Sequence, residues 1–357
     1  MTGALLVFNA MSVIRRHFGK RGLLEFFLLP LPRAGARRIL KEKRQKAACH
    51  VETSLIRASA ILLGISFAGL ALDAFAQQLE PRSYSNTPVG MNFLIAGYGH
   101  TTGEVAADPS IQLENSSFKS HRAVFGYAHG FDVWGKSGKI DVILPYVWAS
   151  GSADLNGQFN ERSVSGFADP ELRFTVNFFG APALTMEEFA DYEQDLIVGT
   201  SLQVSPPVGQ YDSDNLLNIG TNRWAIKPEL GVSKALGPLI LELTAGVAFY
   251  TDNDDFFGGQ TRSQDPLYSV QVHVIYGFRS GIWVALDGTY YTGGQTTIDG
   301  VDSNDLQSNS RVGLTAAFPV NRHNSVKLYA SSGVSARTGG DFETVGLAWQ
   351  YRWGGGL

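Results

Sequence analysis

The histidine and serine residues are the side chains of this 357-residue chain that could form a hydrolytic site. Such a site needs a nucleophile held within hydrogen-bonding reach of a base. His273 is the best candidate for the base, yet Ser269 on the same strand face lies beyond that reach. No G-x-S-x-G motif, paired-histidine zinc pattern, phosphate-binding loop or dinucleotide fingerprint occurs, and the single cysteine is Cys49. We therefore expect no enzymatic activity, no catalytic residues, no metal and no cofactor.

A second group of residues has the spacing of a solute path. Charged and aromatic side chains recur at every second or fourth position of extended segments, which places them on one face of a β-strand. The candidates are Trp283, Asp287, Tyr291, Glu229, Lys227, Arg311 and Tyr329. Ionisable groups at membrane depth often mark solute pathways, and the aromatic rings could stack on a flat solute. The competing interpretation is a salt-bridged, packed interior that keeps a narrow barrel rigid.

Alternating segments position these residues. After Gln77 the sequence contains no apolar run long enough for a transmembrane helix. The predicted strands cover 89–98, 120–133, 139–149, 170–178, 195–205, 222–234, 239–250, 267–279, 281–292, 308–319, 325–336 and 342–353. Most are long enough for a tilted strand to cross a bilayer. One face is apolar and the other is polar, small or charged. The pattern predicts an all-β fold, an antiparallel up-and-down transmembrane β-barrel of about 12 strands.

The last predicted strand has the clearest alternation. Val345, Leu347, Trp349, Tyr351 and Trp353 alternate with small or polar residues and become more aromatic toward the chain end. Alternating aromatics close to the C-terminus resemble the sorting signal of bacterial outer-membrane barrels, so we expect the barrel-assembly machinery to bind this strand. Taken alone, the segment also fits an ordinary strand of a soluble sandwich.

Connection lengths and aromatic positions orient the barrel. Odd-numbered connections are mostly long and even-numbered ones mostly tight, which predicts long extracellular loops and periplasmic termini. Tight turns are expected at 135–138, 236–238, 280 and 321–324. With this orientation, outward aromatics gather at the outer strand ends (Trp148, Trp224, Phe249, Tyr268, Tyr290) and at the inner ends (Phe131, Phe178, Phe278, Phe318, Tyr351, Trp353). Two such girdles are typical of a membrane barrel and have no purpose in a sandwich.

Two connections carry further information. The inner connection 179–194 is long and contains Thr185-Met186-Glu187-Glu188, a capping-box start to a short helix. The predicted outer loops together hold 16 Asp/Glu and 4 Lys/Arg. Such an acidic rim would bridge to anionic lipopolysaccharide through divalent cations.

The first 76 residues have the composition of a targeting leader. They carry 12 Lys/Arg and 4 Asp/Glu, whereas residues 77–357 carry 17 and 29. The apolar run 58–72 follows basic residues and precedes Ala74-Phe75-Ala76, so 51–76 is predicted to be a secretory signal peptide. Residues 1–50 are interpreted as an N-terminal extension or a misassigned start that is absent from the mature protein, and 77–357 as the barrel. The basic leader indicates targeting and not nucleic-acid binding.

Four segments resemble a known family. They are TNRWAIKPELGVS (221–233), YTDNDDF (250–256), YYTGG (290–294) and WQYRW (349–353). The resemblance covers roughly residues 80–354 and is to bacterial outer-membrane proteins of the "meta-pathway of phenol degradation", which are labelled as transporters. It implies a barrel and, in some members, an association with aromatic catabolism. It supplies no functional residues.

These observations predict a bacterial outer-membrane channel for passive uptake of small solutes, hydrophobic or aromatic ones among them. The alternative is a non-conducting structural or adhesive barrel that acts through its acidic extracellular loops. Expected partners are outer-membrane lipid, lipopolysaccharide, the barrel-assembly machinery and a small solute, with no nucleic acid. The oligomeric state is left open. Because the barrel begins about a dozen residues after the cleavage site, no energy-coupling plug domain is expected.

Overall fold

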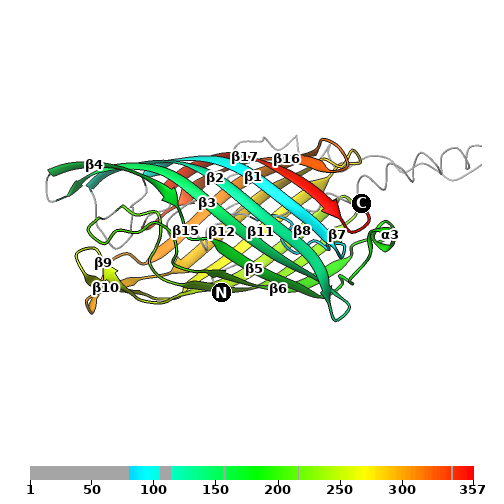
Figure 1. The fold of residues 1–357 in the computed structure, drawn as a ribbon, viewed down its shortest axis with the longest axis horizontal. Coiled ribbons are helices and arrows are strands. Elements are labelled where there is room, and N and C mark those ends of the chain that lie inside the picture. The colour runs from blue at the N-terminus through cyan, green and yellow to red at the C-terminus, as the bar shows by residue number, and fades with distance from the viewer. Residues whose placement is uncertain (1–79, 105–113, 156–157, 216, 339–340) are drawn as a thin grey trace, which may run out of the picture. The chain divides into compact units, whose positions relative to one another are not determined.

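Twelve antiparallel strands form one closed β-barrel in this computed structural model (Figure 1). The structure describes residues 80–104, 114–155, 158–215, 217–338 and 341–357. The barrel strands are β1 (Met91–Glu104), β2 (Glu114–Val133), β3 (Lys136–Leu155), β5 (Glu171–Phe179), β6 (Leu196–Ser205), β7 (Ala225–Leu236), β8 (Leu239–Tyr250), β11 (Leu267–Gly277), β12 (Trp283–Gly293), β15 (Gln307–Pro319), β16 (Asn324–Ser335) and β17 (Asp341–Gly354). The predicted fold class is confirmed, and each predicted strand overlaps one of these. The predicted leader segments 1–50 and 51–76 lie outside the described residues.

The barrel closes through strands from opposite ends of its sequence. β1 pairs with β17 from Met91 opposite Gly354 to Glu104 opposite Asp341, and β1 also pairs with β2. The other strands pair with their neighbours along the chain. Closure gives the barrel strands partners on both sides, so that backbone N–H and C=O groups are satisfied where lipid offers none.

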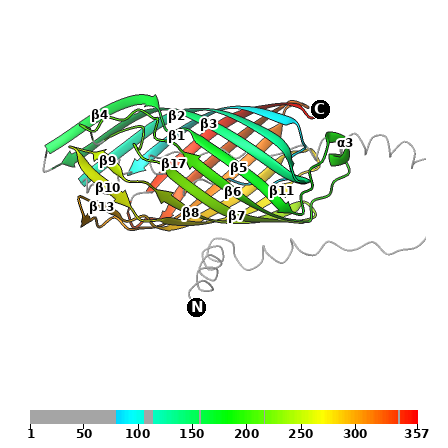
Figure 2. The same ribbon diagram turned by 60° about the horizontal axis from the view of Figure 1, so that its bottom comes forward.

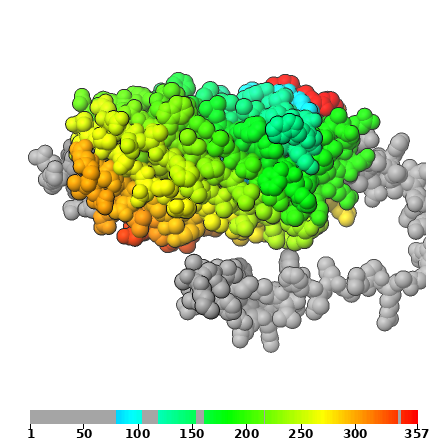
Figure 3. Space-filling model, turned by 90° about the horizontal axis from the view of Figure 1, so that it is seen from below, coloured from blue at the N-terminus to red at the C-terminus, as the bar shows by residue number. Residues whose placement is uncertain are grey.

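The outer wall of the barrel is apolar. In β11, Tyr268, Val270, Val272, Val274 and Tyr276 are 39–54% exposed, whereas the residues between them are buried. Figure 3 shows one side of this wall, where side chains of the green and yellow segments form a continuous surface. Such exposure would be costly in water and is favourable against hydrocarbon. The outer wall therefore faces the hydrocarbon of a membrane. No helix in the described part of the chain is long and apolar enough to cross a membrane.

The two ends of the barrel differ, as Figures 1 and 2 show. The C-terminus and α3 (Met186–Phe189) lie at one end, and β4, β9 and β10 lie at the other. At the first end, Trp134 and Gly135 connect β2 to β3, and both have positive φ (52° and 79°). Two such residues match the twist of paired strands. The predicted turn at 135–138 was wrong in position, because Gly138 is a strand residue that pairs with Phe131.

The end that carries β4, β9 and β10 is the one predicted to be extracellular, and we call it the outer end. It contains strands that the sequence analysis had interpreted as loops. β4 (Gln158–Phe167) pairs with the outer half of β3, while β5 pairs with its inner half. β9 (Asn253–Phe256), β10 (Gln260–Gln264), β13 (Thr296–Ile298) and β14 (Val301–Asp302) form a separate four-stranded sheet. The four are short and polar and show no sustained alternation, so their pairing depends on contacts between two distant loops.

The predicted capping box in the β5–β6 connection is confirmed. Thr185 Oγ1 accepts a hydrogen bond from Glu188 N (3.3 Å), and the Glu188 carboxylate accepts one from Thr185 N (2.8 Å). These two bonds satisfy backbone donors that a helix N-terminus otherwise leaves unpaired. Phe189 at the end of α3 is buried and packs in the same cluster as Met91 and Phe93 of β1. The connection therefore packs against the inner end of the barrel.

Candidate functional site

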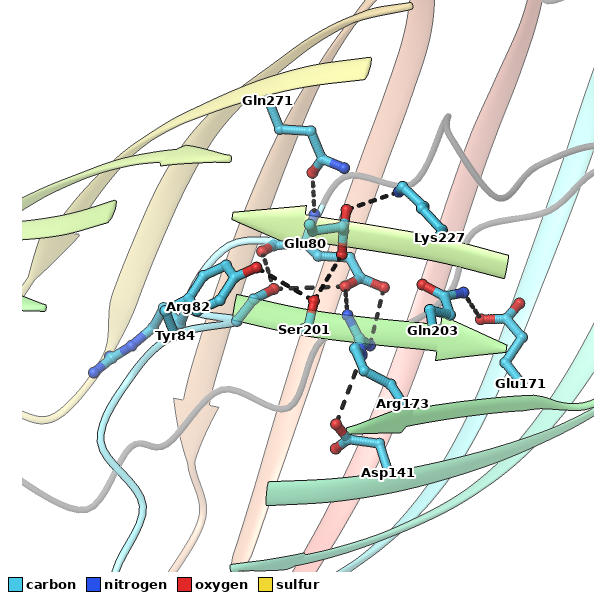
Figure 4. A network of polar contacts seen from close by, with 12 residues as sticks. Glu80, Arg82, Tyr84, Asp141, Glu171, Arg173, Ser201, Gln203, Lys227 and Gln271 are labelled. Carbon is cyan, nitrogen blue, oxygen red and sulfur yellow. Dashed lines mark hydrogen bonds and ion pairs between the residues drawn. The ribbon is translucent and has the colours of Figure 1, made fainter. Parts of the chain in front are cut away.

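Residues 80–88 run inside the barrel, which the sequence analysis did not anticipate. Hydrogen bonds tie this segment to several parts of the wall: Glu80 N to Gln271 Oε1 (3.4 Å), Arg82 N to Glu242 Oε2 (2.6 Å), the Tyr84 hydroxyl to Ser201 Oγ (3.3 Å), Asn86 Nδ2 to Pro182 O (3.2 Å) and Thr87 N to Ser137 Oγ (3.2 Å). Figure 4 shows two of these anchors, Glu80 to Gln271 and Tyr84 to Ser201. Because the partners come from β3, β6, β8 and β11, the segment lies across the lumen. We call it the luminal segment.

An ionic cluster holds the start of the luminal segment. Glu80 forms a two-pronged ion pair with Arg173 of β5, through both guanidinium NH groups. Arg173 Nε also lies 3.6 Å from Asp141 Oδ2, and Lys139 Nζ lies 3.8 Å from the same oxygen. All four side chains are at least nine-tenths buried. A buried charge needs an opposite charge to offset its lost hydration, so Glu80 and the wall depend on each other.

Further ion pairs flank this cluster. Arg122 lies 3.9 Å from Glu171, and Gln203 Nε2 donates to Glu171 Oε2 (2.9 Å). Lys227 Nζ lies 2.8 Å from Glu229 Oε1. The structure thus brings the predicted residues Lys227 and Glu229 together as a buried pair. In this middle part of the lumen, charges are neutralised by neighbours within the wall.

Tyr84 fills a socket made by two glycines. Gly199 of β6 and Gly231 of β7 are directly paired across the sheet. A Cβ atom at Gly231 would lie 2.0 Å from the Tyr84 ring, and one at Gly199 would lie 2.6 Å from it. Only 1% of Tyr84 is exposed. Both positions therefore require glycine, since any side chain there would displace the Tyr84 ring.

Three predicted residues lie along the inner face of β12. Trp283, Asp287 and Tyr291 are all at most 2% exposed. Successive members are four residues apart, or roughly 13 Å along the strand, so they do not form one pocket. The Arg82 guanidinium carbon lies 5.5 Å from the centre of the Trp283 ring, a cation–π contact with the luminal segment. The Tyr291 hydroxyl accepts a hydrogen bond from Asn309 Nδ2 (3.2 Å).

His273 is paired with Asp287 and not with a serine. Its Nδ1 lies 2.7 Å from Asp287 Oδ1, and Thr315 Oγ1 donates to the other carboxylate oxygen (2.8 Å). The Ser269 hydroxyl instead points to Gly246 O at 3.5 Å. The sequence did not identify Asp287 as the partner of His273, because the two residues lie opposite each other on β11 and β12 and this depends on strand register.

Arginine–aromatic contacts lie toward the outer end. The guanidinium of Arg311, a predicted residue, lies 3.6 Å from the centre of the Phe342 ring and donates to Ser331 Oγ (3.0 Å). Arg223 lies over Tyr250 at 4.4 Å. Both guanidinium groups are at most 3% exposed, so these charges and rings pack against each other within the barrel.

Tyr329, the last predicted residue, lies on the most accessible part of the inner wall. Its ring covers Gly346 of β17, where a Cβ would lie 2.1 Å from the ring. Inward side chains of β16, among them Lys327 and Tyr329, are partly exposed, whereas those of β12 are buried. Water therefore reaches the lumen along β16.

One feature of the sequence could have indicated the luminal segment. Glu80, Arg82 and Tyr84 are charged or aromatic residues between the predicted cleavage site and the first strand, where neither targeting nor alternation requires them.

A closed barrel with an apolar wall and a charged interior defines an outer-membrane β-barrel protein. Residues 102–351 match the family described as putative MetA-pathway of phenol degradation, and the chain belongs to this family. The resemblance noted in the sequence is therefore confirmed. No curated protein sequence matches the chain closely enough to serve as a relative.

The chain is similar to several solved structures. The COG4313 outer membrane channel from Pseudomonas putida F1 is 21% identical, with a TM-score of 0.65, and the match covers 77% of this chain and 100% of that one. The CymD monoaromatic hydrocarbon channel is 7% identical (TM-score 0.40, covering 75% and 89%). The KdgM porin is 10% identical (TM-score 0.38, covering 72% and 98%). At 21% identity, the likeness to the first of these structures concerns the fold alone.

Proposed function

We propose that this protein is an outer-membrane channel for passive uptake of small solutes, hydrophobic or aromatic ones among them. The observation that supports this most directly is the lumen itself. Arginine–aromatic contacts lie at its outer end, and partly exposed Lys327 and Tyr329 continue inward along β16. A flat solute would meet the partly exposed Tyr329 ring and the Lys327 ammonium along β16. We propose no catalytic role for the His273–Asp287 pair, since the Thr315 hydroxyl beside it bonds the carboxylate and not the imidazole.

The luminal segment limits the proposed path. Residues 80–88 and the ion pairs around Glu80 occupy the middle of the lumen, so a solute must pass beside the segment along β16 or displace it. Of the predicted path residues, Trp283 and Tyr291 are buried against protein and serve packing in this state. Arg311 is only 3% exposed and packs against Phe342, so Tyr329, which is partly exposed, is the member that we propose contacts solute.

The same segment favours a second candidate function. If the luminal segment stays in place, the barrel does not conduct and acts as a structural or adhesive protein through its acidic extracellular loops. The dense ion pairing of Glu80, Arg173 and Asp141 is the observation that favours this alternative.

Single-channel recording in planar bilayers distinguishes the two functions. The protein is purified from outer membranes and recorded with and without phenol. The channel function predicts steady conductance that phenol reduces in a concentration-dependent way, and weaker block in Tyr329→Ala. Silence from protein that migrates as a folded barrel in unheated gels would contradict it and support the non-conducting alternative.

Two partners belong to the same proposal. β17 would bind the barrel-assembly machinery before it pairs with β1, since its outward Trp349 and Trp353 match the expected sorting pattern. Lipopolysaccharide would surround the outer girdle and contact the acidic loops through divalent cations.

A further inference from the structure

The outer surface of β2, β3 and β4 carries a pocket that is separate from the lumen. Its volume is about 310 Å³, and its polar and aromatic lining consists of Lys119, His121, Trp148, Ser150, Ser163 and Ser165. This volume is at the lower end of the range for small-ligand sites. The pocket requires nothing of the solute path; a ligand here would deepen the lipopolysaccharide contact proposed above, and its test does not depend on conductance.

Strand register explains why these residues converge. Lys119 pairs with Ser150, which pairs with Ser163, and His121 pairs with Trp148, which pairs with Ser165. The six residues thus form two adjacent cross-strand rows. All face outward, because the residues between them on β2 and β3, such as Arg122 and Ala149, are buried on the inner side.

The pocket lies at the height of the outer lipid headgroups. Trp148 belongs to the outer aromatic girdle, which marks the boundary between hydrocarbon and headgroups. The Lys119 row lies two residues farther out, or about 7 Å. The Lys119 ammonium is therefore held at the level of headgroup phosphates, while the Trp148 ring borders the acyl chains below.

The polar groups of the pocket suit a phosphorylated sugar. Lys119 is exposed and supplies a positive charge, and three serines supply hydroxyl groups. His121 is fixed in place, since its Nδ1 lies 2.5 Å from the Tyr98 hydroxyl and its ring packs 4.5 Å from that of His100. Glu161 lies one row farther out, opposite Ser152, and would repel a phosphate placed higher.

We propose that this pocket binds the phosphorylated glucosamine headgroup of the lipid A part of lipopolysaccharide. Lys119 pairs with a phosphate, the serine hydroxyls and His121 face the sugar, and the Trp148 ring packs against its apolar side. The site would hold one outer-leaflet lipid at a defined place on the wall, next to the unusual junction of β3, β4 and β5.

Native mass spectrometry of the delipidated full chain with added lipid A tests this proposal. Lys119→Ala should weaken retention of one lipid A about tenfold, the usual loss for a charged hydrogen-bonded contact. The matched control is Lys136→Ala, which removes an exposed lysine from the start of β3 at the inner end and should leave retention unchanged. Removing the phosphates from lipid A should weaken binding to the wild type as much as Lys119→Ala does.

Three results would overturn the proposal. One is equal retention by the Lys119→Ala and Lys136→Ala variants when both migrate as folded barrels. Another is undiminished binding of dephosphorylated lipid A. The third is displacement of lipid A by millimolar inorganic phosphate alone, which would indicate a free-phosphate site and not a lipid site.

Discussion

Replacing Glu80 by glutamine should release the luminal segment. The substitution keeps the shape of the side chain and removes its charge, so that Arg173 is left with Asp141 at 3.6 Å as its remaining close carboxylate in the cluster. Removing one partner of a buried ion pair typically costs about 3–5 kcal/mol. Because Asp141 offsets part of the lost attraction, we expect Glu80→Gln to cost about 3 kcal/mol. This raises the population of barrels with a released luminal segment about 100-fold.

Hydrogen exchange measures this release directly. Amide protection of residues 82–87, read by mass spectrometry, should fall about 100-fold in Glu80→Gln. Single-channel recordings should show more frequent or larger openings. Glu187→Gln is the matched control, since Glu187 is an exposed carboxylate in the first turn of α3. Unchanged exchange and conductance in a variant that still folds would refute the role of the Glu80–Arg173 pair.

Three further outcomes are expected. Gly231→Val should eject the Tyr84 ring and raise conductance, with little added effect in a Tyr84→Ala background, as recordings of the double variant would show. Hydrogen bonds from the Thr185 backbone and hydroxyl lower the pKa of Glu188. The stability that the cap gives to α3 is therefore present above the ordinary glutamate pKa and is lost as pH falls through the lowered value. Hydrogen exchange of the α3 amides measured against pH checks this, and Thr185→Ala should speed that exchange about fivefold at neutral pH. Leu347→Lys places a charge on the lipid face of β17 and should cost roughly 2–4 kcal/mol in folding titrations into bilayers; an undiminished folding free energy would contradict the assigned face.

The strands and their faces were determined by the sequence because alternation is a local property. In β17, each side chain points opposite to its neighbour whatever the partner strand is, so Trp349 and Trp353 had to share the lipid face. The same holds for Lys227 and Glu229, whose two-residue spacing already placed them side by side in the lumen. The capping box at Thr185 and Glu188 is equally local, since four consecutive residues complete it.

The contents of the lumen were decided by the tertiary structure. Glu80 meets Arg173 across 93 positions of sequence, and His273 meets Asp287 only because β11 and β12 pair in one register. The alternation pattern gives the side on which a residue lies, but not the residue that faces it or whether another segment occupies the space. Those relations follow from closure of the barrel, which brings β1 to β17 and encloses residues 80–88 among charges from several strands. The outward pocket at Lys119 has the same origin, because three strands must align before its two rows exist.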